Sequence, residues 1–113
     1  MNEDDLARLR HMLDAAREAV SFSEGKSFDN VIQERMLLLA LVKDLEIVGE
    51  AASRVSIETR TSIDGIPWGL IIGMRNRLTH GYFDWRTETI WETVTLELPK
   101  LVRALEQVIS SVA

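Results

Sequence analysis

The sequence predicts an all-α protein, an up-and-down bundle of four main helices that forms one domain over residues 1–113. Leu, Ile, Val, Ala and Glu are abundant and the chain has only two prolines and six glycines, a composition that favours helix over sheet. Apolar residues recur every three or four positions through long stretches, which is the helical period. A domain of this size has a modest stability margin, so a partner or a second copy would add to its stability.

The first two predicted helices lie on either side of SFSEGKSFDN, residues 21–30. The second spans about Val31–Ser56, with Asp29 or Asn30 as its cap and MLLLALV, residues 36–42, at its centre. A helix that is apolar on nearly all sides must be covered on nearly all sides, so we expect neighbouring helices on one face and a second protomer on the other. The apolar stripe of the first helix consists of Leu6, Leu9, Leu13, Ala16 and Val20.

The third predicted helix follows the connector IETRTSIDGIPW, residues 57–68. Pro67 suits the first turn of a helix, because its missing N–H would have no partner there. The helix then runs from about Trp68 to Thr79, and Gly81 lies where a helix often ends in a left-handed residue.

The fourth predicted helix runs from about Thr87 to Val112. Pro99 falls inside it and removes one backbone hydrogen bond, so we expect a kink there. Its apolar stripe consists of Ile90, Val94, Leu98, Leu101, Leu105, Val108 and Val112.

Charge and composition narrow the functional classes. The formal net charge of −5 argues against a protein that coats nucleic acid, so any chemistry on a polyanion must be local. The chain has no cysteine, which excludes disulfides and thiolate metal sites and fits the cytoplasm. The acidic N-terminus does not resemble a signal peptide, and the longest apolar run is too short to cross a membrane. We therefore expect a soluble cytoplasmic protein with no membrane partner.

The candidate chemistry is concentrated in RNRLTHGYF, residues 75–83. Arg75 provides a planar cation that matches phosphate oxygens, and His80 can transfer a proton near neutral pH. Asn76 precedes His80 by one helical repeat, and Tyr82 adds a phenol. An arginine and a histidine suffice for RNA cleavage without a metal or cofactor, since one stabilises phosphorane charge and the other deprotonates a 2′-hydroxyl. The sequence offers no HExxH motif, Cys/His cluster or carboxylate set at ligand spacing.

Spacing alone leaves the arrangement of this motif open. Five residues on a straight helix correspond to about 140° of rotation, so Arg75 and His80 do not share a face, whereas Asn76 and His80 do. Either His80 lies beyond the helix end, or Arg75 reaches around, or a second subunit completes the site. A histidine at a helix C-terminus is also favourable through the helix dipole alone, which is an equally good explanation from spacing.

Three other features of the sequence have both a structural and a functional interpretation. Glu46, Glu50 and Arg54 recur at i, i+4 and i+8, a spacing typical of a solvated stripe with one ion pair, although these residues are also candidates to line a cleft. His11 lies off the apolar stripe of the first helix and is expected to face solvent. The three tryptophans near the motif, which favour packing over base stacking, are Trp68, Trp85 and Trp91.

The motif resembles the signature of the HEPN superfamily, and more narrowly that of the HepT toxins. The matching residues are Arg75, followed directly by an asparagine, then His80 and Tyr82. The likeness extends over most of the chain, because residues 45–56, 66–85 and 90–105 read like HepT segments in the same order. The core motif shows no departure from the pattern. Gly69 stands where a larger polar residue is the commoner expectation, which would loosen the third helix slightly.

The resemblance implies a helical bundle that forms a homodimer and brings two copies of the motif into a shared cleft. It implies a metal-independent endoribonuclease with Arg75 and His80 in the catalytic positions and Asn76 and Arg77 positioning the RNA. It further implies a toxin–antitoxin system, in which a minimal nucleotidyltransferase antitoxin transfers AMP onto Tyr82. A bulky anionic adduct so close to His80 would exclude RNA by size and charge.

Two alternatives accompany this interpretation. The first is a non-catalytic HEPN module, a nucleotide-binding or adaptor dimer that acts with a nucleotidyltransferase partner. The second is a helical protein with a purely structural interaction role.

Overall fold

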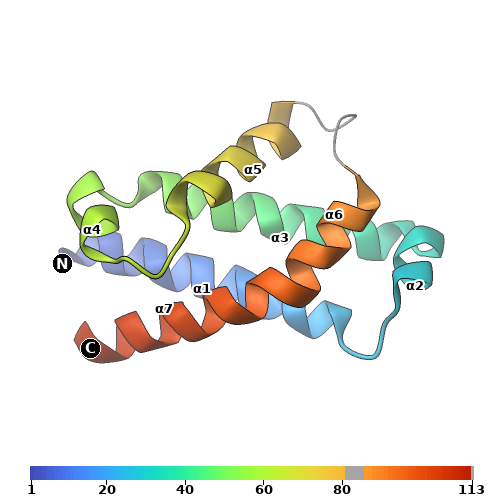
Figure 1. Cartoon of the computed structure of the whole chain (residues 1–113), viewed down its shortest axis with the longest axis horizontal. Helices are drawn as coiled ribbons and strands as arrows, with labels where there is room; N and C mark the ends of the chain where they lie inside the picture. Colours follow the sequence, from blue (N-terminus) through green and yellow to red (C-terminus); the bar gives the residue numbers. More distant parts are fainter. Residues whose placement is uncertain (81–85, 113) are drawn as a thin grey trace.

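The computed structural model describes residues 1–80 and 86–112. All regular secondary structure in these two ranges is helical, which confirms the predicted all-α class (Figure 1). The elements are α1 Glu3–Ser23, α2 Phe28–Gln33, α3 Arg35–Arg54, α4 Ile57–Ser62, α5 Trp68–His80, α6 Thr87–Glu92, the π-helical turn η1 Thr93–Glu97 and α7 Leu98–Val112.

Helix α1 begins where the sequence supplies a cap. The Asn2 side chain accepts a hydrogen bond from the backbone N–H of Asp5 at 2.7 Å, and the acidic first turn suits the positive end of the helix dipole. One face of α1 is buried against α3 and α7. In the predicted apolar stripe, the three central residues Leu9, Leu13 and Ala16 are buried.

The predicted second helix is divided in two, which corrects the boundary expected at Val31. Ser27 and Asn30 form a reciprocal capping box, so α2 begins at Phe28. The helix then breaks at Glu34, whose non-helical backbone separates α2 from α3. Within the apolar run on α3, Met36 is 86% exposed and Leu39 46% exposed, so part of this run is uncovered in the single chain.

Helix α5 begins after Pro67, as predicted, and includes one residue more than expected at its C-terminal end, His80. Its first turn is anchored twice. The N–H of Ile71 donates to the carbonyl of Pro67 at 3.1 Å, and Nε1 of Trp68 donates to the carbonyl of Ile63 at 3.3 Å. Trp68 and Trp91 are half-buried against the core, as the packing interpretation expects, while Trp85 lies outside the described residues.

The predicted fourth helix is a continuous run of α6, η1 and α7. The distortion expected at Pro99 takes the form of a π-helical turn just before it, in which the N–H of Leu98 donates to the carbonyl of Thr93. A proline has no N–H to donate and its ring clashes with the carbonyl four residues earlier. A wider turn at this point fits that local conflict, and π turns are a recognised source of helix bending.

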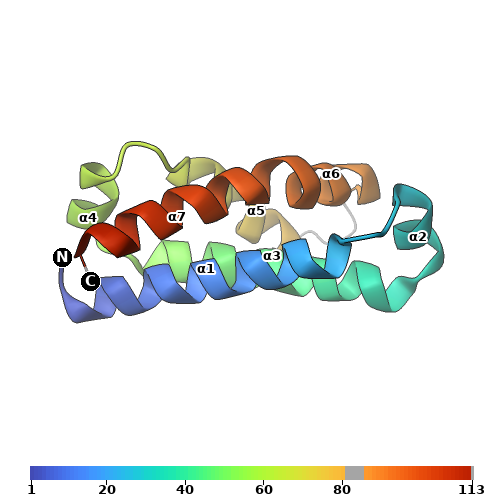
Figure 2. The ribbon, with the colours of Figure 1, turned by 90° about the horizontal axis from the view of Figure 1, so that it is seen from below.

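The helices surround one core. Figures 1 and 2 show α1 beside α3, with the run from α6 to α7 lying over them and α5 resting on α3. Asp5 fixes one end of this arrangement. Its carboxylate accepts hydrogen bonds from the N–H and hydroxyl of Ser56, at 2.9 and 2.6 Å, and from the Thr59 hydroxyl at 2.6 Å. None of the helices in the described residues combines the length and apolar content that a membrane span needs.

Candidate functional site

Arg75 is held at the point where α5 comes closest to α3. Gly49 makes this approach possible, because a Cβ at that position would collide with the Cβ of Arg75 and lie 3.2 Å from the carbonyl oxygen of Ile71. The base of the Arg75 side chain is therefore fixed by packing against the backbone of α3. Sequence reasoning did not identify Gly49, since a helical glycine reveals its partner only once the two helices are placed.

The guanidinium of Arg75 is oriented by polar contacts from two helices. Its Nη2 pairs with Oε2 of Glu50 at 2.5 Å, and its Nη1 donates to Oδ1 of Asn76 at 3.0 Å. The other oxygen of Glu50 accepts from Nε of Arg54 at 2.8 Å. One carboxylate thus joins two arginines. The hydrogen bond from Arg54 is the main reason that the pKa of Glu50 lies below its usual value, and the charge of Arg75 adds to it.

A surface groove of about 440 Å³, called here the Arg75 groove, is lined by Glu50, Arg54 and Arg75 together with seven neighbouring residues. Helix α3 forms its floor, while α1 and α5 form its two walls. Each helix contributes side chains at helical spacing, so each presents one stripe to the groove. The lining residues are Arg8, His11, Lys43, Glu46, Ile47, Glu50, Ala51, Arg54, Arg75 and Thr79.

The structure brings together Arg75 and the three residues considered as possible cleft lining, Glu46, Glu50 and Arg54. The exposed Glu50–Arg54 pair at i, i+4 is equally what a solvated stripe would show. Four further polar residues of the groove were not anticipated, namely Arg8, His11, Lys43 and Thr79. Arg8 and His11 are three residues apart and share a helix face, but only the packing of α1 on α3 places that face beside Arg75. His11 is exposed, as expected.

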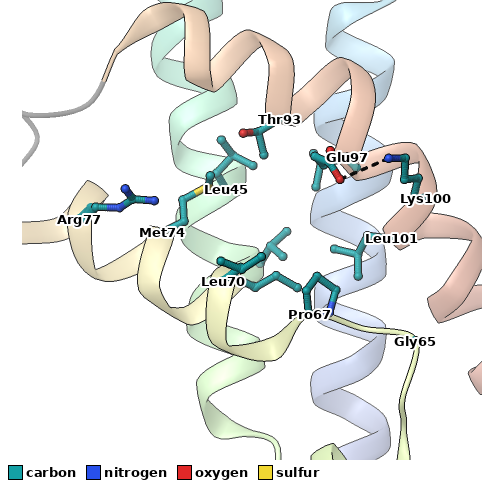
Figure 3. Close-up of a pocket in the computed structure, with 13 residues that line it drawn as sticks. Leu45, Gly65, Pro67, Leu70, Met74, Arg77, Thr93, Glu97, Lys100 and Leu101 are labelled. Atoms are coloured by element: carbon teal, nitrogen blue, oxygen red, sulfur yellow. Dashed lines mark ion pairs between the residues drawn. The ribbon is translucent and has the colours of Figure 1, made fainter.

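Arg77 lies on the other side of α5. Two residues after Arg75 on a helix is a rotation of about 200°, and Arg77 lines a second cavity of about 470 Å³, called here the Arg77 cavity. This cavity has a largely apolar floor, with Leu45 and Met74 among its residues, and lies between α5 and the run from η1 to α7 (Figure 3). The structure therefore does not bring Arg77 together with Arg75.

The structure also narrows the arrangements considered for His80. The backbone of α5 is helical through Arg75 and His80, so His80 is the last residue of the helix and does not lie beyond its end. Asn76 and His80 are four residues apart on this helix and share one face. Tyr82 and Gly81 lie outside the described residues.

Among residues 1–80 and 86–112, no group of three or more His, Cys, Asp or Glu side chains is arranged to hold a metal ion. The polar groups of the Arg75 groove are instead cationic side chains with two interspersed carboxylates. Such an arrangement suits the binding of a phosphate, because arginine presents paired donors to two phosphate oxygens at once.

The fold and this groove define an all-helical protein with a surface groove rich in arginine. The chain belongs to the HepT-like family, described as ribonuclease HepT-like, whose family model matches residues 12–108. This match confirms the resemblance seen in the sequence.

Individual relatives match along nearly their whole length. "Putative RNase TTE0752" of Caldanaerobacter subterraneus subsp. tengcongensis is 34% identical over 101 residues, which cover 89% of this chain and 90% of that protein. "Putative RNase MJ1380" of Methanocaldococcus jannaschii is 30% identical over 103 residues, covering 91% and 94%. "Probable ribonuclease HepT" of Thermococcus cleftensis is 26% identical over 99 residues, covering 88% and 90%. No solved structure gave a significant match.

Proposed function

We propose that this protein is a metal-independent endoribonuclease that acts as the toxin of a toxin–antitoxin pair in the cytoplasm. The observation that carries the proposal is the position of Arg75, whose guanidinium is held by Glu50 and Asn76 at the edge of a cationic groove. Membership of the HepT-like family and the ribonuclease names of the relatives support it.

In the proposed reaction, the 2′-hydroxyl oxygen of one nucleotide attacks the adjacent phosphorus. His80 accepts the hydroxyl proton, the O2′–P bond forms and the P–O5′ bond breaks, leaving a 2′,3′-cyclic phosphate and a 5′-hydroxyl. Arg75 binds the non-bridging oxygens, where charge accumulates in the transition state. Asn76 keeps the guanidinium oriented. Because Arg75 is already paired with Glu50, the phosphate must share or replace that carboxylate.

We further propose that the working unit is a homodimer. Arg75 and His80 are five residues apart within one continuous helix, so their backbone positions lie about 140° apart around its axis, on different sides of the helix. A second copy supplies the missing group, and a second His80 protonates the leaving 5′-oxygen. The exposed Met36 and Leu39 on α3 provide apolar surface for such an association.

The proposed control of this toxin acts through Tyr82. A minimal nucleotidyltransferase antitoxin would join the phenol oxygen of Tyr82 to the α-phosphorus of ATP, with release of pyrophosphate. The resulting AMP group adds negative charge and bulk two residues from His80, which repels the RNA phosphate from the site.

Cleavage of a long single-stranded RNA in the presence of EDTA tests the enzymatic proposal. Arg75→Ala and His80→Ala should each lower the cleavage rate by about 100-fold or more. Both variants should keep the helical circular dichroism and the dimeric mass of the wild type. A wild-type protein that cuts no RNA would overturn the proposal and favour the non-catalytic, nucleotide-binding alternative.

The toxicity of the protein and its inhibition by the antitoxin are tested by separate measurements. Expression of the wild type should arrest growth, and expression of His80→Ala should not. Co-expression with a neighbouring nucleotidyltransferase gene should add mass in multiples of AMP to the peptide that contains Tyr82. Tyr82→Phe should abolish this gain; an adduct that persists in the variant would place the modification at another residue.

A further inference from the structure

The Arg75 groove continues beyond Arg75 onto α1, which contributes one arginine, Arg8. Four lysine or arginine side chains line the groove, against two carboxylates. Arg54 and Arg75 share the Glu50 carboxylate. Arg8, which is half-buried, forms no ion pair or hydrogen bond within the described residues. An arginine that is partly desolvated without a counter-charge, in a chain of net charge −5, favours the binding of an anion there.

The register of the helices shows where Arg8 lies relative to Arg75. Asp5 of α1 bonds Ser56 at one end of α3, and Glu18 of α1 lies beside Asp44 farther along, so the two helices run antiparallel. Counting at an equal rise from these two contacts places Arg8 level with residues 53 and 54 of α3, and His11 level with residues 50 and 51.

This register separates two cationic positions in one groove. Arg75 reaches Glu50 from the α5 side, whereas Arg8 and Arg54 flank the groove one helical turn farther along α3. One turn corresponds to about 5.4 Å along the helix axis. Arg8 belongs to α1 and Arg75 to α5, on opposite walls of the groove, so a strand that follows the groove can place one phosphate at Arg75 and a neighbouring phosphate beside Arg8.

We propose that Arg8 and Arg54 form a second phosphate subsite, which binds the RNA backbone next to the phosphate held by Arg75. This inference rests on the proposed ribonuclease function and adds a binding role for α1. Arg54 contacts Glu50 through Nε, at 2.8 Å, which leaves its two Nη groups for a phosphate oxygen. His11 follows Arg8 by three residues on α1, also lines the groove and offers a ring donor to the same strand.

Arg10 provides a matched control on the same helix. It lies two residues from Arg8 and lines a different surface pocket, with Arg17 and Glu106 between α1 and α7. Arg8→Glu and Arg10→Glu change the net charge of the protein by the same amount, so a difference between them reports position and not overall charge.

The first measurement is binding of a single-stranded oligonucleotide with 2′-O-methyl groups, which cannot be cleaved, over a range of salt concentrations. Arg8→Glu should raise Kd by about tenfold at low salt and reduce the slope of log K against log salt by about 0.7, the value for one phosphate contact on a single strand. Arg10→Glu should stay within about twofold of the wild type, and Arg8→Lys should bind more tightly than Arg8→Glu. Thermal melting of each variant verifies that it is folded.

The second measurement is cleavage of RNA substrates of decreasing length. On long RNA, Arg8→Glu should raise KM by about tenfold. The ratio of wild-type to variant kcat/KM should fall toward one on a dinucleotide, which has no second phosphate to reach the subsite. Equal effects of Arg8→Glu and Arg10→Glu, or no effect of either, with normal wild-type cleavage would overturn the subsite and leave the ribonuclease proposal intact. A wild type that neither binds nor cuts RNA would overturn both.

Discussion

Two of the three carboxylates on helix α3, those of Asp44 and Glu50, lie in opposite surroundings. Asp44 faces α1 and is only 2% exposed, and its Oδ2 has no donor among the described residues. Burial raises the pKa of Asp44 to about 7, and a hydrogen bond to Glu18 and the charge of that residue add to the shift. Glu50 faces α5 and contacts two arginines, and its pKa is lowered chiefly by the hydrogen bond from Arg54. The buried position against α1 thus favours a neutral carboxyl, and the position beside two arginines, one from α3 and one from α5, favours a charged one.

Asp5 shows that the partner, rather than burial alone, decides between these two states. Asp5 is as buried as Asp44, at 3% exposed. The hydroxyls of Ser56 and Thr59 nevertheless lower its pKa, because they donate hydrogen bonds to the ionised form. On α3, the same distinction favours the ionised carboxylate at Glu50, which lines the Arg75 groove, and that carboxylate pairs with Arg75.

The largest expected effect comes from separating α3 and α5 at Gly49. Gly49→Ala introduces a Cβ that collides with the Cβ of Arg75, so α5 must shift and the Glu50–Arg75 pair must stretch. We expect a loss of about 3 kcal/mol in the free energy of unfolding, measured by urea denaturation.

Gly73→Ala is the matched control for Gly49→Ala, because a Cβ at Gly73 meets nothing within 4 Å. It should stabilise α5 by up to about 1 kcal/mol through helix propensity. Equal stability changes for the two variants would contradict the close approach of α3 and α5.

The next effect concerns Asp44 and depends on pH. The folded state keeps the Asp44 proton up to a pKa of about 7, whereas an unfolded aspartate loses it near pH 4. Between these values the folded state binds more protons, so this residue makes stability fall as pH rises. Asp44→Asn removes the titration and should stabilise the protein above pH 7 by on the order of 2 kcal/mol, with little change at pH 4. Urea denaturation across this range measures it.

Asp14→Asn serves as the control for Asp44→Asn, because Asp14 is an exposed aspartate on α1. It should leave the pH dependence of stability as in the wild type. If Asp44→Asn also retained the wild-type dependence, the contrast between the two sides of α3 would be wrong.

A smaller effect is expected on the groove side. Glu50→Gln removes the negative charge between Arg54 and Arg75 but preserves the size of the side chain. RNA should bind about threefold more tightly at low salt, because the phosphate no longer competes with a carboxylate. The value of kcat should fall, because Arg75 loses its strongest orienting contact. Binding and single-turnover cleavage separate the two changes; a decrease in both affinity and kcat would mean that Glu50 supports the phosphate site only by positioning.

The smallest effect is expected for Arg77→Ala, across α5 from the groove. Arg77 lines the Arg77 cavity and not the Arg75 groove, so cleavage of RNA should change by less than about threefold. A loss as large as that of Arg75→Ala would show that RNA contacts both sides of α5.

Sequence reasoning located the elements whose signals are local. The apolar stripes gave α1 and the α6–α7 run, and Pro67 marked the start of α5. The break at Glu34 between α2 and α3 was not predicted, because the apolar pattern of the sequence continues across it. The spacing of Glu46, Glu50 and Arg54 identified a polar face of α3, but which helices would face it depends on packing. The roles of Gly49 and Arg8 also depend on packing, because each of these residues acts together with a residue on another helix.

The π-helical turn before Pro99 makes the length of that segment as important as its composition. A π turn holds one residue more than the α-helical turn it replaces, and it lies between the buried Ile90 on one side and the buried Leu98, Leu101 and Leu105 on the other. Deletion of one residue from Thr93–Glu97 would restore a regular α-helix and rotate one set against the other by about 100°. Leucines now inside the bundle would then point into water, so a change that regularises the local hydrogen bonding would misalign the whole C-terminal helix.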